Sequence, residues 1–150
     1  MKKQIIIILL VLFCLIFTSC EGYSDDDISR SDERMESIIA DIGVSDEEKL
    51  VVKKPYDTAL DCIVYLIYVK ENGAIKEYTC EFYETVYGYK DAMDYYDIRS
   101  VKKIYSVVSH DEEACMVCVV NTSVSFDSLD RLTQQFSDPH YIKHGYEIIK

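Results

Sequence analysis

Cys115 and Cys118 are separated by two residues, which is the spacing of the reactive pairs found in thiol-redox proteins. Such a pair needs a lowered thiolate pKa and a geometry in which the two sulfur atoms meet. Both cysteines lie in a β-branched run that continues through Val119-Val120, and this composition favours a strand. In a strand their side chains would point to opposite faces, with Cα atoms ~10 Å apart and beyond the ~7 Å limit for a disulfide. The sequence therefore predicts that these two candidate thiols do not bond to each other.

Four cysteines follow residue 31, namely Cys62, Cys80, Cys115 and Cys118. Four thiols permit three disulfide connectivities, so geometry has to narrow the choice. The hairpin predicted below places Cys62 and Cys80 on opposite faces, so any disulfide should join the first hairpin to the second. The interpretation that we favour is that all four are small buried thiols that pack as hydrophobic side chains.

His140 and His144 are four residues apart, a spacing that could place two metal ligands on one helical face. Gly145 and strand-like surroundings argue against a helix there, and no further ligand stands at a suggestive spacing. We therefore predict surface histidines and no metal site. No nucleophile, base and orienting group are recognisable together and no phosphate loop exists, so the sequence predicts neither a catalytic residue nor a cofactor.

Thirteen tyrosines and no tryptophan are the compositional oddity of this chain. Four of them, Tyr87, Tyr89, Tyr95 and Tyr96, lie in one short segment and exceed what one helical face can bury. Tyrosine combines a large contact area with a polar tip, which is why it is enriched at protein interfaces. If the domain binds a protein, we expect the exposed residues among these four to form the binding surface. The alternatives are rings that cover the core with their hydroxyls in water, and a glycan or small-molecule site.

The chain is acidic, with 27 Asp and Glu residues against 16 Lys and Arg residues and a net charge of −11. The longest basic clusters are the pairs Lys53-Lys54 and Lys102-Lys103. Nucleic acid is therefore excluded as a partner, because phosphate contacts need clustered basic side chains. Repulsion also excludes acidic proteins, which leaves a neutral or basic protein partner.

The elements that must position these residues can be traced from periodicity and turn signals. Asn72-Gly73 favours a tight type I′ turn between two apolar runs, residues 60–69 and 74–83. The two-residue loop sets a register in which Ile63 lies opposite Phe82. The face that pairs Val64 with Glu81 is mixed and is expected to be partly solvated.

The other elements complete an α+β pattern. Helical spacing predicts helices over residues 35–42, 86–97 and 126–136, the last capped by Ser125 and ended by Asp138-Pro139. Residues 101–108 and 114–120 read as a second hairpin with His110 in its turn, residues 141–149 as a strand, and residues 50–52 as a candidate edge strand. We expect an antiparallel sheet built from two β-hairpins plus a C-terminal strand, with helices packed on one face.

The first twenty residues have the layout of an export signal, with a basic start at Lys2-Lys3, an apolar run over residues 5–17 and small residues before Cys20. A helix over that run would rise ~20 Å, short of the ~30 Å hydrocarbon layer, so a transmembrane span is the weaker interpretation. Residues 17–20, Phe-Thr-Ser-Cys, resemble the lipobox of bacterial lipoproteins, although Phe17 replaces the usual aliphatic residue. The resemblance implies cleavage between Ser19 and Cys20 and a diacylglyceryl group on the Cys20 sulfur. The alternatives are an uncleaved signal anchor and an ordinary secretory peptide.

The predicted organisation is therefore a signal peptide over residues 1–19, a lipidated cysteine and acidic flexible tether over residues 20–31, and a single domain over residues 32–150. The run Asp25-Asp26-Asp27 is similar to the acidic stretch after the lipidated cysteine in surface-exported lipoproteins of the Bacteroidetes. We expect a location in the bacterial cell envelope, lipid-anchored to a membrane, with the outer membrane or cell surface as candidates. The function expected is a non-enzymatic binding or protein-interaction module. The alternative is an envelope enzyme or thiol-redox protein whose site is not visible in the sequence.

Overall fold

The structure is a computed structural model of the chain, and it describes residues 31–38 and 49–149. The predicted signal peptide, its cleavage site at Ser19 and Cys20, and almost all of the tether lie outside the described residues. So does the second half of the first predicted helix.

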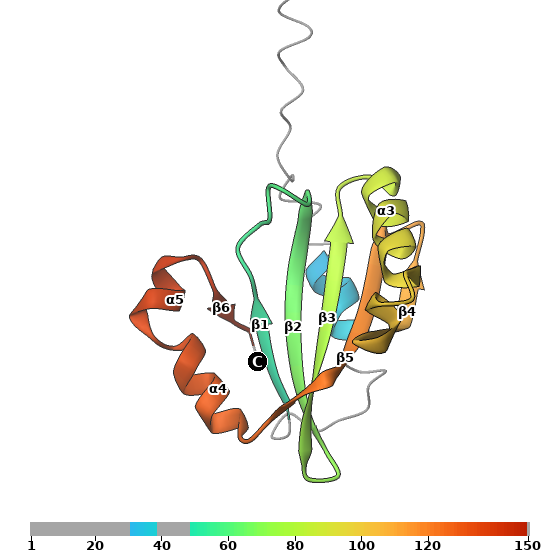
Figure 1. Cartoon of the computed structure of the whole chain (residues 1–150). Coiled ribbons are helices and arrows are strands. Elements are labelled where there is room, and N and C mark those ends of the chain that lie inside the picture. Colours follow the sequence, from blue (N-terminus) through green and yellow to red (C-terminus); the bar gives the residue numbers. More distant parts are fainter. Residues whose placement is uncertain (1–30, 39–48, 150) are drawn as a thin grey trace, which may run out of the picture. The chain divides into compact units, whose positions relative to one another are not determined.

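Six antiparallel strands form one open sheet in the order β4-β5-β3-β2-β1-β6 (Figure 1). The strands are β1 (Lys49–Lys53), β2 (Cys62–Glu71), β3 (Ala74–Tyr83), β4 (Tyr105–Asp111), β5 (Met116–Phe126) and β6 (Glu147–Ile148). The predicted α+β class is confirmed. The suggestion of an edge strand at residues 50–52 was wrong, because β1 lies between β2 and β6.

The β2–β3 hairpin follows from its two-residue turn. Asn72 and Gly73 have φ angles of 51° and 84°, and a type I′ turn requires positive φ at both positions. The register puts Ile63 opposite Phe82 and Cys62 opposite Tyr83, as the turn predicts. Because side chains alternate along a strand, Cys62 and Cys80 lie on opposite faces of the sheet.

Three helices follow the first hairpin: α3 (Val86–Asp97), α4 (Leu129–Phe136) and α5 (Pro139–Lys143). The bounds of α3 are those predicted, and the Thr85 hydroxyl caps it by accepting the Gly88 N–H at 3.1 Å. The predicted start of α4 was wrong, because β5 continues to Phe126 and the cap is Ser128 rather than Ser125. A short 3₁₀ turn, η2 (Val101–Lys103), precedes β4 in the segment predicted as strand.

Helix α5 occupies part of the segment that was predicted as a C-terminal strand, and only β6 remains extended there. Asp138 caps α5 by accepting the His140 N–H at 2.8 Å, and Pro139 stands in the first turn. Proline is tolerated at that position because its missing N–H would have no partner inside the helix. The Asp-Pro pair therefore starts a helix here as well as ending the previous one.

Helices α3 and α4 pack on the same face of the sheet, over different parts of it (Figure 1). Each helix contributes buried residues to its own apolar cluster. The α3 cluster consists of Cys62, Val64, Tyr83, Tyr89, Ala92, Tyr96, Val117 and Val119. The α4 cluster consists of Leu50, Val52, Tyr68, Ile75, Leu132 and Phe136. Burial of two helix faces on one sheet face is the main apolar contribution on this side.

The opposite face of the sheet is apolar and buried as well. Its side chains include Val51, Tyr65, Ile67, Cys80, Phe82, Met116 and Cys118. Residues 33–38 lie on this side, with Met35 and Ile38 buried and Arg34 Nη2 donating to Asp111 Oδ2 at 2.7 Å (Figure 1). The prediction that all helices pack on one face was therefore wrong.

Candidate interaction surface

The tyrosines of α3 divide between the outside and the inside of the molecule. Tyr87 and Tyr95 are exposed, with 77% and 51% of their surface accessible, and Ile98 beside them is 49% accessible. Tyr89 and Tyr96 are only 5% and 8% accessible. Naming Tyr89 and Tyr96 as candidate surface residues was therefore wrong, because both belong to the core.

The two inner tyrosines are held by polar partners as well as by packing. The Tyr89 hydroxyl lies 3.0 Å from His110 Nδ1, and the Tyr96 hydroxyl donates to Glu81 Oε1 at 3.1 Å. Buried tyrosine hydroxyls usually find such partners. Helical spacing places Tyr89, Ala92, Met93 and Tyr96 on one face, and Tyr89, Ala92 and Tyr96 of that face are buried.

The outer face of α3 combines aromatic rings with acidic side chains. Asp91 and Asp94 are exposed on the same stretch of helix as Tyr87 and Tyr95. Residues at spacings of three, four and seven share a helical face, which brings Tyr87, Asp91, Asp94 and Ile98 into one stripe. We call Tyr87, Asp91, Asp94, Tyr95 and Ile98 the α3 outer face.

A buried carboxyl group, that of Glu81, lies beneath the inner face of the same helix, and no sequence motif pointed to it. Glu81 is 8% accessible and accepts hydrogen bonds from Tyr83 at 2.8 Å and from Tyr96 at 3.1 Å. Burial raises the pKa of the Glu81 carboxyl, against the lowering effect of the two tyrosine donors and of Lys54. The expectation that this face is partly solvated was wrong at Glu81. The one sequence feature that could have indicated a buried Glu81 is its position between apolar residues of a predicted strand.

Among the described residues, Cys62 and Cys115 are free thiols, and both are held in the protonated form. Burial, with Glu81 and Asp57 nearby, raises the pKa of the Cys62 thiol to about 12. Burial and the neighbouring carboxylates Glu112 and Asp111 also raise the pKa of Cys115. Because the thiolate is the nucleophilic form, neither thiol is activated at neutral pH.

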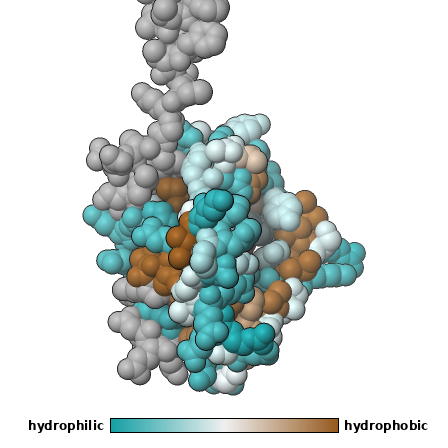
Figure 2. Space-filling view, turned by 90° about the vertical axis from the view of Figure 1, so that its left-hand side faces the viewer, coloured by the Kyte–Doolittle hydropathy of each residue, from teal (hydrophilic) through white to brown (hydrophobic). Residues whose placement is uncertain are grey.

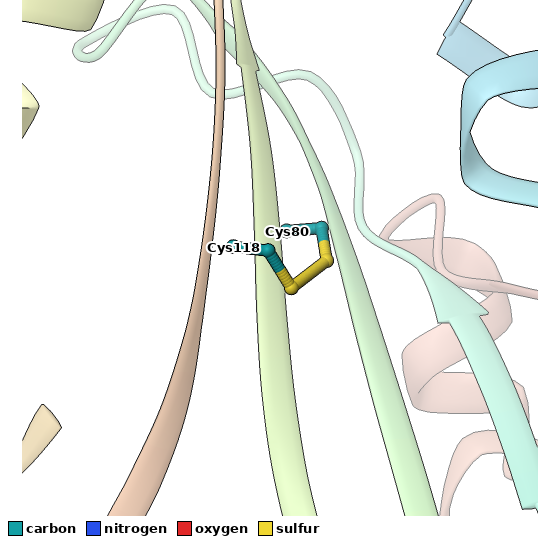
Figure 3. Close-up of a disulfide and its surroundings, with 2 residues drawn as sticks. All are labelled: Cys80 and Cys118. Carbon is teal, nitrogen blue, oxygen red and sulfur yellow. A yellow bond between two sulfur atoms is a disulfide. The ribbon is translucent and has the colours of Figure 1, made fainter. Parts of the chain in front are cut away.

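One disulfide links the two hairpins, between Cys80 on β3 and Cys118 on β5 (Figure 3). The two residues are directly opposite in the sheet register, and their Cα atoms are 4.1 Å apart. The expectation that a disulfide would join the two hairpins is confirmed. The favoured interpretation of four buried thiols was wrong, because Cys80 and Cys118 are bonded, and Cys115 and Cys118 form no redox pair. Cys115 instead lies in the β4–β5 turn with a φ of 50°.

The histidines do not form a metal site with other ligands in the described part of the chain. His140 and His144 lie in and directly after α5, with ring centroids 4.3 Å apart and His144 Nδ1 2.7 Å from the His140 carbonyl oxygen. Within residues 31–38 and 49–149, no group of three His, Cys, Asp or Glu side chains could hold a metal ion. His110 lies in β4 rather than in the predicted turn.

Other apolar side chains are exposed away from α3. Figure 2 shows the side of the molecule that carries α5 and β6, where polar side chains run down the middle and apolar ones gather on either side. Ile142 in α5 and Ile149 directly after β6 are exposed, at 58% and 45%. The α3 outer face differs from this side because tyrosines supply most of its apolar area.

No helix among the described residues is long and apolar enough to cross a membrane. Comparison with known proteins found no matching family model, no matching curated protein and no matching solved structure.

Proposed function

We propose that this chain is a lipoprotein of the bacterial cell envelope, anchored through lipid on Cys20, and that its folded part binds another protein without catalysis. The anchor rests on the sequence of residues 1–20. The binding role rests on the α3 outer face, and the two parts of the proposal are tested separately.

Exposure of Tyr87 and Tyr95 is the observation that carries the binding role. Both rings project from a helix whose opposite side already supplies Tyr89, Ala92 and Tyr96 to the core. The outer rings are therefore not needed to bury that side of the sheet. Exposed tyrosines beside an exposed isoleucine are the kind of residue that forms the energetic centre of a protein interface.

The charge of the surface indicates the kind of partner. Asp91 and Asp94 lie between the two exposed tyrosines. Removal of residues 1–19 takes away Lys2 and Lys3 and no acid, so 14 basic and 27 acidic side chains remain and the net charge becomes −13. A neutral or basic protein fits this surface, because an acidic one would be repelled both locally and at long range.

The thiol-redox alternative loses its support in the described residues. Cys118 is bonded to Cys80, and both are buried with 0% accessibility. The pKa values of Cys62 and Cys115 are raised, which opposes thiolate formation. A reactive thiol would need the opposite shift.

The test is a binding assay with the full chain as bait in detergent-solubilised envelope extract of the host. Tyr87→Ser with Tyr95→Ser should weaken capture of a specific protein by about 1 kcal/mol or more per residue, because each ring would lose its contact area. The free energy of unfolding should fall by no more than about 1 kcal/mol, because both rings are exposed and only Tyr95 packs against another ring, that of Tyr96 at 5.3 Å.

Leu60→Ser with Ile142→Ser is the matched control, since these side chains are 53% and 58% exposed outside α3. This control should capture the same protein as the wild type. Equal capture by the tyrosine variant would show that the α3 outer face is not the binding surface.

A further inference from the structure

Strand β4 has a neighbour on one side only among the described residues, because it stands at the end of the sheet order (Figure 1). Its side chains from Ser106 to His110 are exposed, including Val107 at 38% and Val108 at 51%. An exposed edge of this length presents backbone donors and acceptors that can pair with another strand. The opposite edge, β6, has only two residues.

The register of β4 shows which backbone groups face outward. Thr122 N–H donates to the Ile104 carbonyl at 2.7 Å, so Ile104 faces β5, and alternation turns the groups of Tyr105 and Val107 to the free edge. The register shifts between Val107 and Ser109, which makes Val108 an extra residue. Beyond it, alternation turns His110 outward.

This shift gives the free edge a local two-fold pattern. Ser106 and Ser109, which flank the Val107-Val108 pair, turn their backbone groups toward β5. The next residue on each side, Tyr105 or His110, turns its backbone groups to the free edge. In two antiparallel copies of the same edge, Tyr105 and His110, which both turn their N–H and C=O groups outward, can therefore pair on either side of the two-fold axis. A dimer with two-fold symmetry has this kind of self-complementary interface.

Charge follows the same two-fold pattern. The basic pair Lys102-Lys103 precedes β4, and the acidic pair Glu112-Glu113 follows it, at equal distances from the midpoint between Val107 and Val108. In an antiparallel pair of copies, each basic pair would lie beside the acidic pair of the other copy. An unrelated strand would match this charge order only by coincidence.

We propose that β4 pairs antiparallel with β4 of a second copy of this chain. Tyr105 lies opposite His110 of the second copy, and Val107 lies opposite its Val108. Lys102 and Lys103 lie beside Glu113 and Glu112 of the second copy. The six-stranded sheet then continues across the two-fold axis.

The ion pairs that these side chains already make do not oppose the pairing strongly. Lys102 pairs with Asp97, and Lys90 pairs with Glu112 at 3.1 Å, but all four side chains are more than half exposed. Such exposed pairs contribute little to stability, so Lys102 and Glu112 can be shared with a second copy.

The test uses two charge variants of the full chain, each carrying a different affinity tag and kept in the same non-ionic detergent. Variant A is Lys102→Glu with Lys103→Glu, and variant B is Glu112→Lys with Glu113→Lys. Copies of A alone, or of B alone, would meet with like charges at both ends of β4. In a mixture of A and B, opposite charges meet at both ends again.

We expect the wild-type chain to co-purify with a differently tagged wild-type copy. Each variant should self-associate at least about tenfold more weakly than the wild type, while A and B together regain most of that affinity. Lys143→Glu with Arg131→Glu changes the net charge as A does, away from β4, and should behave as the wild type. Circular dichroism of all variants checks that they fold.

Two outcomes overturn the proposal. A wild-type chain that remains monomeric at about 100 µM has no self-pairing edge in this affinity range. A wild-type dimer whose association does not follow the A and B pattern uses a different surface.

Discussion

At the scale of single residues, the buried carboxyl of Glu81 links the sheet to helix α3. It lies on β3 and accepts hydrogen bonds from Tyr83 on the same strand and from Tyr96 on α3. The low polarity around it raises the pKa of Glu81 and also the pKa values of both tyrosines. A group in this position makes the stability of the fold depend on pH.

Substitution of this residue tests that dependence. The raised pKa of Glu81 means that the native state holds the proton more tightly than the unfolded chain does. Its contribution to stability is therefore present below the unfolded pKa of about 4.5 and is lost as the pH rises through the folded pKa. The free energy of unfolding of Glu81→Gln, measured by urea denaturation, should consequently fall less than that of the wild type as the pH rises from 4.5 to neutral.

The matched control for this prediction is Glu113→Gln, which removes an exposed carboxyl in the β4–β5 turn. Lys54, Asp57, Cys62, Tyr83 and Tyr96 face or surround the Glu81 carboxyl and are unchanged in both variants. An identical pH dependence in the wild type and Glu81→Gln would contradict a raised pKa at this position.

At the scale of elements, the Cys80–Cys118 disulfide links β3 to β5. These two strands pair in the sheet although α3, η2 and β4 lie between them in the sequence. The two cysteines are 38 residues apart in sequence. A cross-link of that length removes loop-closure entropy from the unfolded chain that amounts to about 4 kcal/mol in the chain-entropy account. Replacement of both cysteines by alanine should therefore lower the free energy of unfolding by about 3 to 4 kcal/mol in urea denaturation.

Cys115→Ala is the control for loss of a thiol, and it should cost less than about 1 kcal/mol because Cys115 is unbonded and only partly buried. Alkylation in denaturant without reductant should label Cys62 and Cys115. Labelling of Cys80 and Cys118 under the same conditions would show that the bond is absent.

The elements that sequence predicted correctly are those fixed by local chemistry. Asn72-Gly73 determines the β2–β3 register through two backbone angles, and Thr85 with its following apolar spacing determines α3. The start of α4 was misplaced because Ser125 and Ser128 are both good caps, and only the length of β5 chooses between them. The position of β1 inside the sheet depends on its pairing with β6, which is a contact between distant parts of the chain.

Of the four candidate surface tyrosines, two are exposed and two are buried, and the difference again depends on contacts with distant parts of the chain. Composition identified the tyrosine-rich segment, but exposure of a given ring depends on which strands lie beneath α3. The buried position of Tyr96 depends on its hydrogen bond to Glu81 and its ring contact with Tyr105. The buried position of Tyr89 depends on its contact with His110. Those partners come from β3 and β4, and no local pattern in residues 86–97 names them.

At the scale of the whole molecule, charge bears on how the proposed lipoprotein is held at a membrane. The part of the chain from Cys20 onward has a net charge of −13, so anionic lipid repels it. Attachment must then come from acyl chains, each buried methylene of which contributes ~0.8 kcal/mol. One cysteine, Cys20, would carry this attachment.

The last prediction is that Cys20→Ala moves the protein from the detergent phase to the aqueous phase in a detergent-partitioning assay, or leaves an unlipidated precursor of higher mass. Cys14→Ala is the matched control, because Cys14 lies in the apolar run and is not the residue modified. It should partition as the wild type does. A Cys20→Ala chain that has the mass of the wild type, apart from the substitution, and still partitions into detergent would show that something other than lipid on Cys20 holds both chains. The acidic domain could not supply that affinity, so the apolar run of residues 5–17 would then have to be retained as an anchor, and mass measurement distinguishes the two cases.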